Sequence, residues 1–291
     1  MKKNKIFEKS IETVLFLCAF ISTLSVFFIM IFIFREGLPL FKNVNLFDFL
    51  FGRVWAPSDD LPAYGILPFI AGSVWVTFGA LLLSLPVGLA VGIFMAEFAK
   101  GSIAGILRKV IELLAGIPSV IYGLFGYAVI APIIRRFSNS PTGLGILTAA
   151  IILAVMILPT IINMTEVSLR AVPVELKEGS LALGATLWQT IYRTLLPAAK
   201  SGIIAGVVLG MGRAIGETMA VLMVAGNSIL MPENLLSLTR TLTMNIATDM
   251  KYAADEHWTS LFTTGIVLFC FILALNLIVQ LLLKKSIKRT G

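Results

Sequence analysis

Arg213 and Glu217 lie four residues apart in the run GMGRAIGET, which begins at Gly210 inside an otherwise apolar stretch of the sequence. Opposite charges at this spacing face each other on a helix. A charged side chain near the centre of a bilayer costs about 2.5–3.5 kcal/mol even on the mildest scale, so such residues usually mark ion or substrate pathways. The planar guanidinium of arginine suits tetrahedral oxyanions, because it donates paired hydrogen bonds. The pair predicts either a fixed positive charge in an anion pathway, held at rest by Glu217, or a buried ion pair that sets the register of its helix.

Small residues accompany this pair on one side of the predicted helix. With about 100° between successive residues, the two charges share an arc of roughly 120° with four glycines. These are Gly202, Gly206, Gly210 and Gly216. Because small residues allow another helix to approach closely, we expect the charged face to meet protein or water rather than lipid.

A polar segment of the chain, at about 171–198, interrupts two long apolar runs. It contains Glu178 and Gly179, then Ala182 and Gly184, and ends in the run Thr194 to Pro197. A membrane protein gains nothing in the bilayer from such an interruption, so we expect this segment to lie in water and to contact something there.

Apolar residues recur every four positions within this segment, at Leu183, Leu187, Ile191 and Leu195. This spacing predicts an apolar stripe on a short amphipathic helix, with a break at Gly184 and an end at Pro197. Such a helix docks into a hydrophobic groove of a partner, with Trp188 as a large anchor, or lies on lipid headgroups. Periodicity alone does not decide between the two.

The composition places the elements that carry these residues in a membrane. The sequence has 291 residues, of which 58% are hydrophobic and 13% charged, whereas soluble domains average about 25% charged residues. Six runs reach the roughly 20 residues that a membrane-spanning helix needs, and backbone groups in lipid must be bonded within their own segment. The sequence therefore predicts an all-α, polytopic membrane protein with one transmembrane domain over residues 1–291. The six expected spans are 13–34, 69–96, 111–134, 146–165, 199–225 and 260–283.

The distribution of Lys and Arg predicts the orientation of these spans. With the N-terminus in the cytoplasm, fifteen of the 23 basic residues fall in cytoplasmic loops and tails and seven in outer segments. This excess favours both termini inside. It also accounts for the net charge of +7, so we expect no nucleic-acid partner.

The sequence lacks residues for several other kinds of chemistry. No G-x-x-x-x-G-K-[ST] run is present, so any ATP must be hydrolysed by a separate polypeptide and the chain is not itself an enzyme. His257 has no Cys or Asp partner at metal-ligand spacing, and we expect no metal site and no cofactor. Pro86, Pro118 and Pro159 fall inside the expected spans, where we expect kinks.

The polar segment resembles the cytoplasmic coupling loop of bacterial ABC import permeases, in which E-A-A and G precede I-x-L-P by fixed spacings. Glu178, Ala182, Gly184, Leu196 and Pro197 fall in register with that pattern. Two departures stand out, because Gly179-Ser180 replaces two alanines and Thr194 replaces isoleucine. The resemblance implies that this loop docks on an ATPase.

Almost the whole chain is similar to the phosphate-specific ABC permeases. The likeness rests on GRAIGET around Arg213, on YGILPFIAGS from Tyr64, and on GIPSVIYG from Gly116. The stretch VNLFDFLFG from Val44, with Trp55 after it, resembles the C-type subunit of that family.

This resemblance implies the fold of type I ABC importer permeases in the bacterial inner membrane, among membrane lipids, and transport of phosphate by alternating access. The implied partners are a second permease subunit, a dimer of ATP-binding subunits and an extracytoplasmic phosphate-binding protein. Arg213 and Glu217 match the family residues associated with phosphate translocation. The coupling residues implied are Glu178, Gly179, Ala182, Gly184, Trp188, Leu196 and Pro197.

Three other functions remain open from the residues alone. A permease for molybdate, sulfate or another oxyanion would differ in competition uptake. An ion-coupled secondary transporter would work without an ATPase and fail with an uncoupler. A membrane scaffold or sensor would tolerate neutralisation of Arg213.

Overall fold

The protein is seen here in a computed structural model, which describes residues 2–287, with the side chains of 2–8, 10, 278–280 and 282–287 left aside. Within these residues six helical segments are long and apolar enough to cross a membrane, which confirms the predicted number. They are Ile11–Lys42, Leu67–Glu97, Ser119–Phe137, Ile146–Arg170, Leu187–Gly216 and Asp255–Leu277. The basic residues expected to flank the spans at both termini (Lys2, Lys3, Lys5, Lys284, Lys285, Lys288 and Arg289) lie outside the described side chains.

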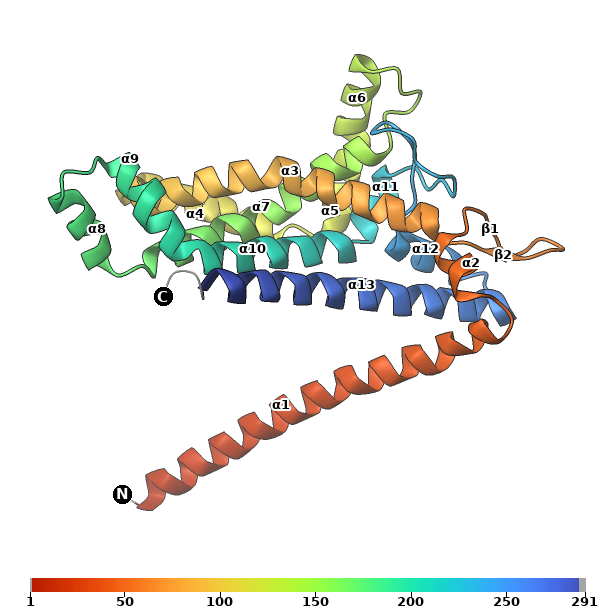
Figure 1. The fold of residues 1–291 in the computed structure, drawn as a ribbon, viewed down its shortest axis with the longest axis horizontal. Helices are drawn as coiled ribbons and strands as arrows, with labels where there is room; N and C mark the ends of the chain where they lie inside the picture. Colours follow the sequence, from red (N-terminus) through yellow and green to blue (C-terminus); the bar gives the residue numbers. More distant parts are fainter. Residues whose placement is uncertain (1, 288–291) are drawn as a thin grey trace.

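Helix α7 (Ile146–Arg170) forms the centre of the bundle (Figure 1). It packs along most of its length against α3 (Leu67–Glu97) and α10 (Leu196–Gly216). Two thirds of its most apolar window, 67%, is buried within the chain, against 28% for α3 and 22% for the span that ends in α10. Because α7 is so buried, it supplies many residues of the main core cluster, among them Ile152, Met156 and Ile157.

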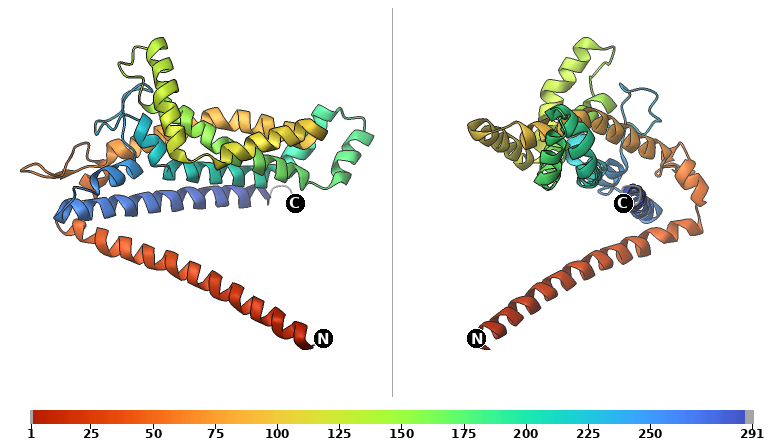
Figure 2. Two further views of the ribbon diagram at one scale, coloured as in Figure 1. Left: turned by 180° about the vertical axis from the view of Figure 1, so that it is seen from behind. Right: turned by 60° about the vertical axis from the view of Figure 1, so that its left-hand side comes forward.

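The first helix, α1 (Lys2–Gly37), leaves the bundle and meets it at one end (Figures 1 and 2). Its contact with α13 (Asp255–Ile287) is close at Gly37, where an added Cβ would lie 2.7 Å from Ile266 Cδ1. None of the most apolar window of α1 is buried within this chain. Its side chains are therefore left for lipid or for another protein.

The two ends of the bundle carry different small elements (Figures 1 and 2). One end, called here the coupling end, holds α8 (Val174–Ala182) and α9 (Leu187–Thr190). The other end, called the hairpin end, holds a 3₁₀ turn (Leu38–Lys42), α2 (Leu46–Phe51), the antiparallel strands β1 (Trp55–Ala56) and β2 (Ala63–Tyr64), and α12 (Leu242–Asp249).

The third span differs from the prediction of one helix over 111–134. Helix α4 (Gly101–Gly116) ends before Pro118, and a new helix begins with α5 (Ser119–Phe125). It continues through a π-helical turn (Gly126–Ile130) into α6 (Ala131–Phe137). The residue before Pro118 has φ −68° and ψ 127°, the extended conformation that proline imposes on its predecessor. Pro118 therefore breaks the helix, whereas Pro86 and Pro159 remain inside α3 and α7.

The fifth span is also divided, where one helix over 199–225 was predicted. Helix α10 ends at Gly216, and α11 (Met219–Val224) begins after a break at Glu217 and Thr218. This break lies directly after Arg213, so it changes the geometry of the candidate site.

Candidate transport and coupling sites

Arg213 lies in the last turn of α10, and its side chain is exposed on the surface of this chain. It makes no hydrogen bond or ion pair with any residue that the structure describes, although it lies within electrostatic range of the Tyr122 hydroxyl. All five N–H donors of its guanidinium are therefore free of protein acceptors within the described chain.

The glycines predicted to share one arc with Arg213 fall into two groups. An added Cβ at Gly202 would meet Ser168 of α7 at 2.1 Å, and one at Gly206 would meet Met164 at 2.4 Å. A Cβ at Gly210 would lie 3.5 Å from Ile161, an ordinary contact distance. One at Gly216 would meet nothing within 4 Å, and the same holds for Gly212, which was not among the glycines of the predicted arc. The first glycines thus let α10 approach α7, whereas the positions that flank Arg213 are open.

Glu217 does not form the predicted ion pair with Arg213. Its backbone is extended, with φ −71° and ψ 127°, because α10 has already ended. Its Oε1 accepts a hydrogen bond from the backbone N–H of Ala220 at 3.2 Å, in the first turn of α11. Its carbonyl oxygen accepts one from Thr243 Oγ1 at 3.1 Å. The prediction that the two charges face each other was wrong, since i,i+4 geometry requires an unbroken helix.

An exposed guanidinium within a membrane span cannot face lipid without a cost of several kcal/mol. Open glycine positions flank it, so another helix or water can reach it. The surface around Arg213 is therefore one that a second protein or a water-filled path must cover in the membrane. A tetrahedral oxyanion arriving there would find guanidinium donors that no acceptor of the described chain engages.

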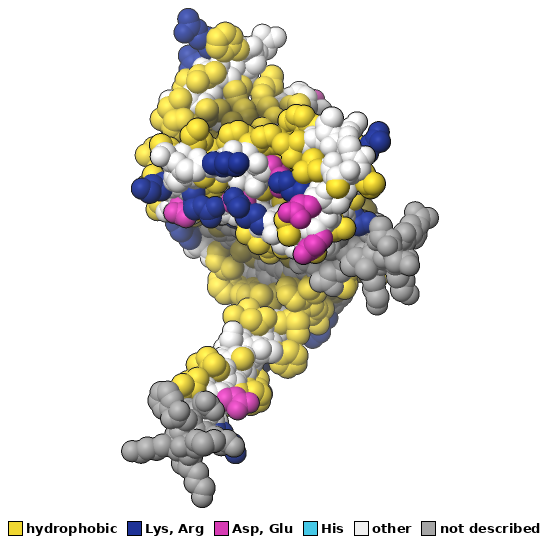
Figure 3. Space-filling view, turned by 90° about the vertical axis from the view of Figure 1, so that its left-hand side faces the viewer, with side chains coloured by type: hydrophobic (Ala, Val, Ile, Leu, Met, Phe, Trp, Pro, Cys, Tyr) yellow, Lys and Arg dark blue, Asp and Glu magenta, His cyan; other side chains and the backbone are white. Residues whose placement is uncertain are grey.

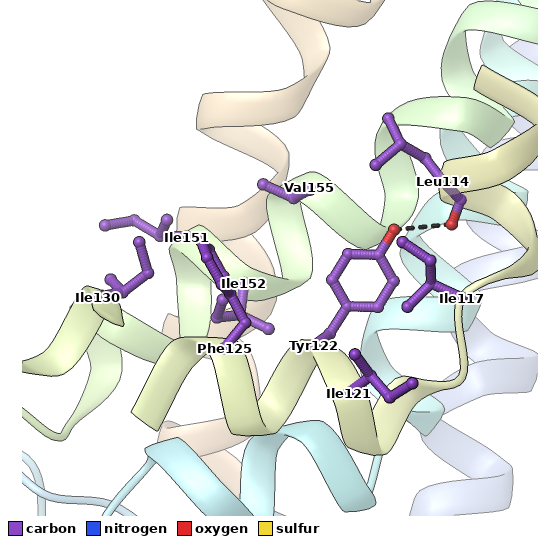
Figure 4. A pocket seen from close by; sticks show the side chains of 9 residues that line it. All are labelled: Leu114, Ile117, Ile121, Tyr122, Phe125, Ile130, Ile151, Ile152 and Val155. Atoms are coloured by element: carbon purple, nitrogen blue, oxygen red, sulfur yellow. Dashed lines mark hydrogen bonds between the residues drawn. The ribbon is translucent and has the colours of Figure 1, made fainter. Parts of the chain in front are cut away.

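A cavity of about 280 Å³ lies nearby, between α4, α5 and α7 (Figure 4). Its lining is apolar, with Ile117, Phe125 and Ile152 among the side chains. The hydroxyl of Tyr122 donates to the carbonyl oxygen of Leu114 at 2.7 Å, which ties α5 to α4 across the break at Pro118. With its one hydroxyl so engaged, this cavity offers nothing to bind an anion.

The coupling end presents the residues of the predicted loop. Glu178, Gly179, Ala182 and Gly184 are all exposed. Gly184 has φ +86° and ends α8, with its N–H bonded to Leu181 O at 2.9 Å, as glycine does after a helix C-terminus. The predicted break at this glycine is confirmed.

Helix α9 begins with a capping box. Thr186 Oγ1 accepts from the backbone N–H of Gln189, and the Gln189 side chain accepts from the N–H of Thr186. The Ser180 and Thr190 hydroxyls lie 2.9 Å apart, which joins α8 to α9.

The apolar stripe of the coupling segment differs from its prediction. Ile191 and Leu195 are 1% and 2% exposed, in a core cluster with Leu169 and Ala199 of the same chain. Leu183 lies at the end of α8 and is 91% exposed. The stripe is therefore not one docking face, because the turn at Gly184 separates its first member from the buried ones.

Three further residues of the predicted coupling motif lie where the sequence did not place them: Trp188, Leu196 and Pro197. The ring of Trp188, 66% exposed, lies 5.5 Å from the ring of Phe98 at the end of α3. Leu196 and Pro197 lie within the continuous helical span Leu187–Gly216, so the predicted end at Pro197 was wrong. The π-helical turn Ile191–Leu195 precedes them, and the N–H of Leu196 bonds to Ile191 O. Such a turn accommodates a proline, which lacks an N–H of its own.

Basic and acidic side chains gather together on the coupling end (Figure 3). Glu166 is 4% exposed and accepts from Arg108 at 2.7 Å and from Arg170 at 2.9 Å. The pairing of Glu166 with Arg170 follows from their i,i+4 spacing, whereas the contact with Arg108 joins α7 to α4.

Sequence reasoning missed a polar cluster at the hairpin end. Arg240, 8% exposed, donates to Asn227 Oδ1 at 2.8 Å, to Asn245 Oδ1 at 2.9 Å and to Asp249 Oδ1 at 3.1 Å. Its guanidinium lies 5.8 Å from the Phe69 ring centre. Asn245 and Asp249 lie four residues apart on α12, a spacing that places them on one face of a helix, but nothing in the local sequence indicates that Arg240 and Asn227 fold onto that face.

His257 belongs to the same cluster. Its Nε2 lies 3.5 Å from Asp249 Oδ2, which also accepts from Trp55 Nε1 at 3.0 Å. Among the described residues no group of three His, Cys, Asp or Glu side chains is placed to hold a metal ion. Asp249 therefore joins β1 to α12 by a charge-assisted hydrogen bond with Trp55, and His257 of α13 lies beside it with no hydrogen bond at Nε2 within the described chain.

Comparison with known proteins agrees with this architecture. Residues 88–290 match the family model described as "Binding-protein-dependent transport system inner membrane component". The chain is 44% identical over 268 residues to the probable ABC transporter permease protein YqgH of Bacillus subtilis, covering 89% of this chain and 86% of that protein. It is 35% identical over 263 residues to the phosphate transport system permease protein PstC of Xylella fastidiosa (strain Temecula1), covering 84% and 81%.

Solved structures show the same fold. An inward-facing structure of the MetNI methionine ABC transporter matches with a TM-score of 0.62 and 18% identity, covering 76% of this chain and 95% of the other. An amino acid ABC transporter matches with a TM-score of 0.55 and 15% identity, covering 75% and 92%.

Six spans, an exposed charge on one of them and a helical coupling segment define a permease subunit of an ABC importer, a multi-pass inner-membrane protein without an ATPase of its own. The chain belongs to the family of binding-protein-dependent inner-membrane transport components, within the group of C-type permeases that includes the PstC proteins.

Proposed function

We propose that this protein is a permease subunit that moves inorganic phosphate inward by alternating access, driven by ATP hydrolysis in a separate subunit. The observation that carries the proposal is Arg213, whose guanidinium is exposed on a membrane span and has no protein acceptor among the described residues. Several relatives that cover most of the chain are named phosphate transport permeases. Phosphate is a tetrahedral oxyanion, and arginine binds such groups by paired hydrogen bonds.

The single transmembrane domain, residues 1–291, is oriented with its coupling end in the cytoplasm. The N-terminal end of α1, the C-terminal end of α13 and the α8–α9 segment all lie toward this end (Figure 1), so both termini are cytoplasmic. The excess of Lys and Arg on this side supports the orientation.

The coupling loop, at about 171–198, contacts the ATP-binding subunits. The exposed residues Glu178, Gly179, Ala182 and Gly184 form the contact surface, and Leu196 and Pro197 carry the segment into α10. Trp188 supports this segment through its ring contact with Phe98, at the end of α3 of the same chain. A second permease subunit covers the surface around Arg213, and an extracytoplasmic binding protein delivers phosphate at the hairpin end.

In this arrangement Arg213 supplies a fixed positive charge beside the path of the anion. Glu217 stabilises the break between α10 and α11, because its side chain accepts a hydrogen bond from Ala220. Since Glu217 is bound there, the guanidinium of Arg213 stays available to the anion. No covalent step takes place in this subunit.

The test is phosphate uptake into proteoliposomes that contain both permease subunits, the ATPase and the binding protein. We expect ATP-dependent uptake that persists with an uncoupler, and a loss of at least about tenfold for Arg213→Ala, since the intramembrane charge is replaced by a methyl group. Lys9→Ala, at an exposed basic residue of α1 outside the spans, is the control and should retain uptake.

Competition with molybdate and sulfate tests the substrate. If molybdate or sulfate inhibited the uptake of labelled phosphate more strongly than unlabelled phosphate does, the phosphate assignment would be overturned. Unchanged uptake by Arg213→Ala at equal expression would overturn the pathway assignment.

A further inference from the structure

The last turn of α3 collects contacts from three other elements at the coupling end. Arg170 Nη2 of α7 donates to the carbonyl oxygen of Met95 at 2.9 Å. Lys177 Nζ of α8 lies 2.5 Å from Glu97 Oε2. The Trp188 ring lies 5.5 Å from the Phe98 ring, between α9 and the residue that follows α3. The coupling segment is thus attached to α3 at two consecutive residues, Glu97 and Phe98.

The carboxylate of Glu97 depends on its ion pair with Lys177. The side chain of Glu97 is 8% exposed, and it lies in the last turn of a helix, where the macrodipole disfavours an acidic group. A buried carboxylate needs a charged or hydrogen-bonding partner. Lys177, whose side chain is 33% exposed, supplies this partner from α8. A displacement of α8 away from α3 would leave the carboxylate of Glu97 buried without its partner.

The same turn is tied to the rest of the bundle by a second ionic group. Arg170, which binds the Met95 carbonyl, also donates to Glu166 of its own helix, and Glu166 accepts from Arg108 of α4. A cation is favoured at a helix C-terminus, where unpaired carbonyl groups remain. The last turns of α3 and α7 and the middle of α4 therefore share one network beside the coupling segment.

We propose that the Glu97–Lys177 pair, with the Phe98–Trp188 contact beside it, fixes α8–α9 to α3, so that the coupling segment and α3 move as one body during transport. This inference rests on the proposed function and adds the route by which motion enters the membrane. α3 extends for 31 residues from this pair to the hairpin end, where Phe69 lies against Arg240. Lys177 is a positioning residue for coupling, and its role differs from that of the exposed residues that touch the ATPase.

Charge exchange tests the pair. In the complete importer, Lys177→Glu should lower phosphate uptake per ATP hydrolysed by on the order of tenfold or more, while the ATPase still co-purifies. Lys177→Glu combined with Glu97→Lys should restore much of this ratio, because the ion pair is rebuilt with its charges exchanged. Lys109→Glu, an exposed lysine of α4 at the same end, makes the same change of charge and should leave the ratio unaltered.

A covalent link tests whether the two elements move together. After replacement of Cys18 and Cys270 by serine, cysteines at positions 98 and 188 are joined by a short bismaleimide. If α9 and α3 move as one body, the linked importer takes up phosphate at least as fast as the same double-cysteine variant before linking, because the link replaces the lost aromatic contact.

The outcomes separate this inference from the proposed function. Absence of ATP-dependent phosphate uptake by the unmodified importer would remove the function itself. Normal uptake together with an unaffected ratio in Lys177→Glu, or a transport block by the 98–188 link, would overturn the inference alone. A loss of complex assembly in Lys177→Glu that the charge exchange does not restore would also count against it.

Discussion

Glu217 Oε1 accepts a hydrogen bond from the backbone N–H of Ala220 at 3.2 Å. The carboxylate therefore holds the start of α11, although its spacing from Arg213 suggests an ion pair. The Glu217 carbonyl is bound in turn by Thr243 of α12. A single acidic residue thus joins the break in the fifth span to the helix at the hairpin end.

This relationship predicts different results for two substitutions of Glu217. Glu217→Gln keeps an oxygen that can accept from Ala220, so we expect near-normal phosphate uptake. Glu217→Ala removes the acceptor, and we expect a loss of about 1 kcal/mol in the free energy of unfolding together with reduced uptake. Uptake and thermal unfolding of the two purified variants are the measurements. If the charge of Glu217 were needed to hold Arg213, the glutamine variant would fail as well.

Arg240 is predicted to be the most sensitive arginine for stability. Arg240→Met would leave Asp249, whose side chain is only 16% exposed, without its cation. Breaking a buried ion pair from one side costs about 3–5 kcal/mol, and this partly buried pair should approach the lower end of that range. We expect a marked fall in the thermal midpoint of the detergent-solubilised protein. Arg135→Met, an exposed arginine at the end of α6, is the control, and an equal fall in both variants would contradict a specific role for the cluster.

Tyr64 predicts an alkaline limit to stability. Burial, and next the neighbouring Glu256 carboxylate, raise the pKa of the Tyr64 hydroxyl above its usual value. The unfolded chain releases this proton near pH 10, at the ordinary pKa of tyrosine, whereas the folded chain retains it to higher pH. Stability from this group is therefore present below about pH 10 and is lost as the pH rises through the folded pKa.

The measurement is the thermal midpoint as a function of pH on the alkaline side. Tyr64→Phe should lose less stability than the parent between neutral pH and the alkaline limb. Tyr252→Phe, at a tyrosine that is 82% exposed, should follow the parent curve. If the thermal midpoints of Tyr64→Phe and the parent fell in parallel as the pH rises, this prediction would be contradicted.

The left-handed backbone of Gly184 allows the turn in the coupling loop to be tested by substitution. Its φ of +86° lies in the left-handed region, and an added Cβ would meet no atom within 4 Å. Substitutions therefore act through the backbone rather than through packing. We expect Gly184→Asn to keep ATPase binding, since asparagine tolerates this region, and Gly184→Val to lose it, at a cost of roughly 1–2 kcal/mol for a β-branched residue.

Co-purification of the ATPase with each variant is the measurement. Equal recovery with valine and asparagine would show that the turn at Gly184 does not need its left-handed backbone for docking.

Much of the fold could be read from local sequence. Apolar length predicted six spans, which the described residues have, and the i,i+4 spacing of Glu166 and Arg170 accounts for their ion pair at 2.9 Å. The coupling segment was identified by its polar character and by the glycine at 184. These features depend on residues that are near in sequence, where helix geometry alone decides which side chains meet.

Local spacing failed where the helix itself was interrupted. Pro118 ends α4 rather than kinking a span, and the break at Glu217 removes the helical turn that would have paired it with Arg213. The stripe from Leu183 to Leu195 failed for the same reason, because the turn at Gly184 places its members on different elements.

By itself, then, the sequence determined the membrane class, the number of spans and the family of this protein, since hydrophobic length and short motifs act along the chain. Only the tertiary structure decided that Glu97 meets Lys177, that Phe98 meets Trp188, and that the buried Arg240 meets Asp249. Each of these contacts joins separate elements. Their formation depends on how α3, α7 and α12 pack and on which charges that packing removes from solvent.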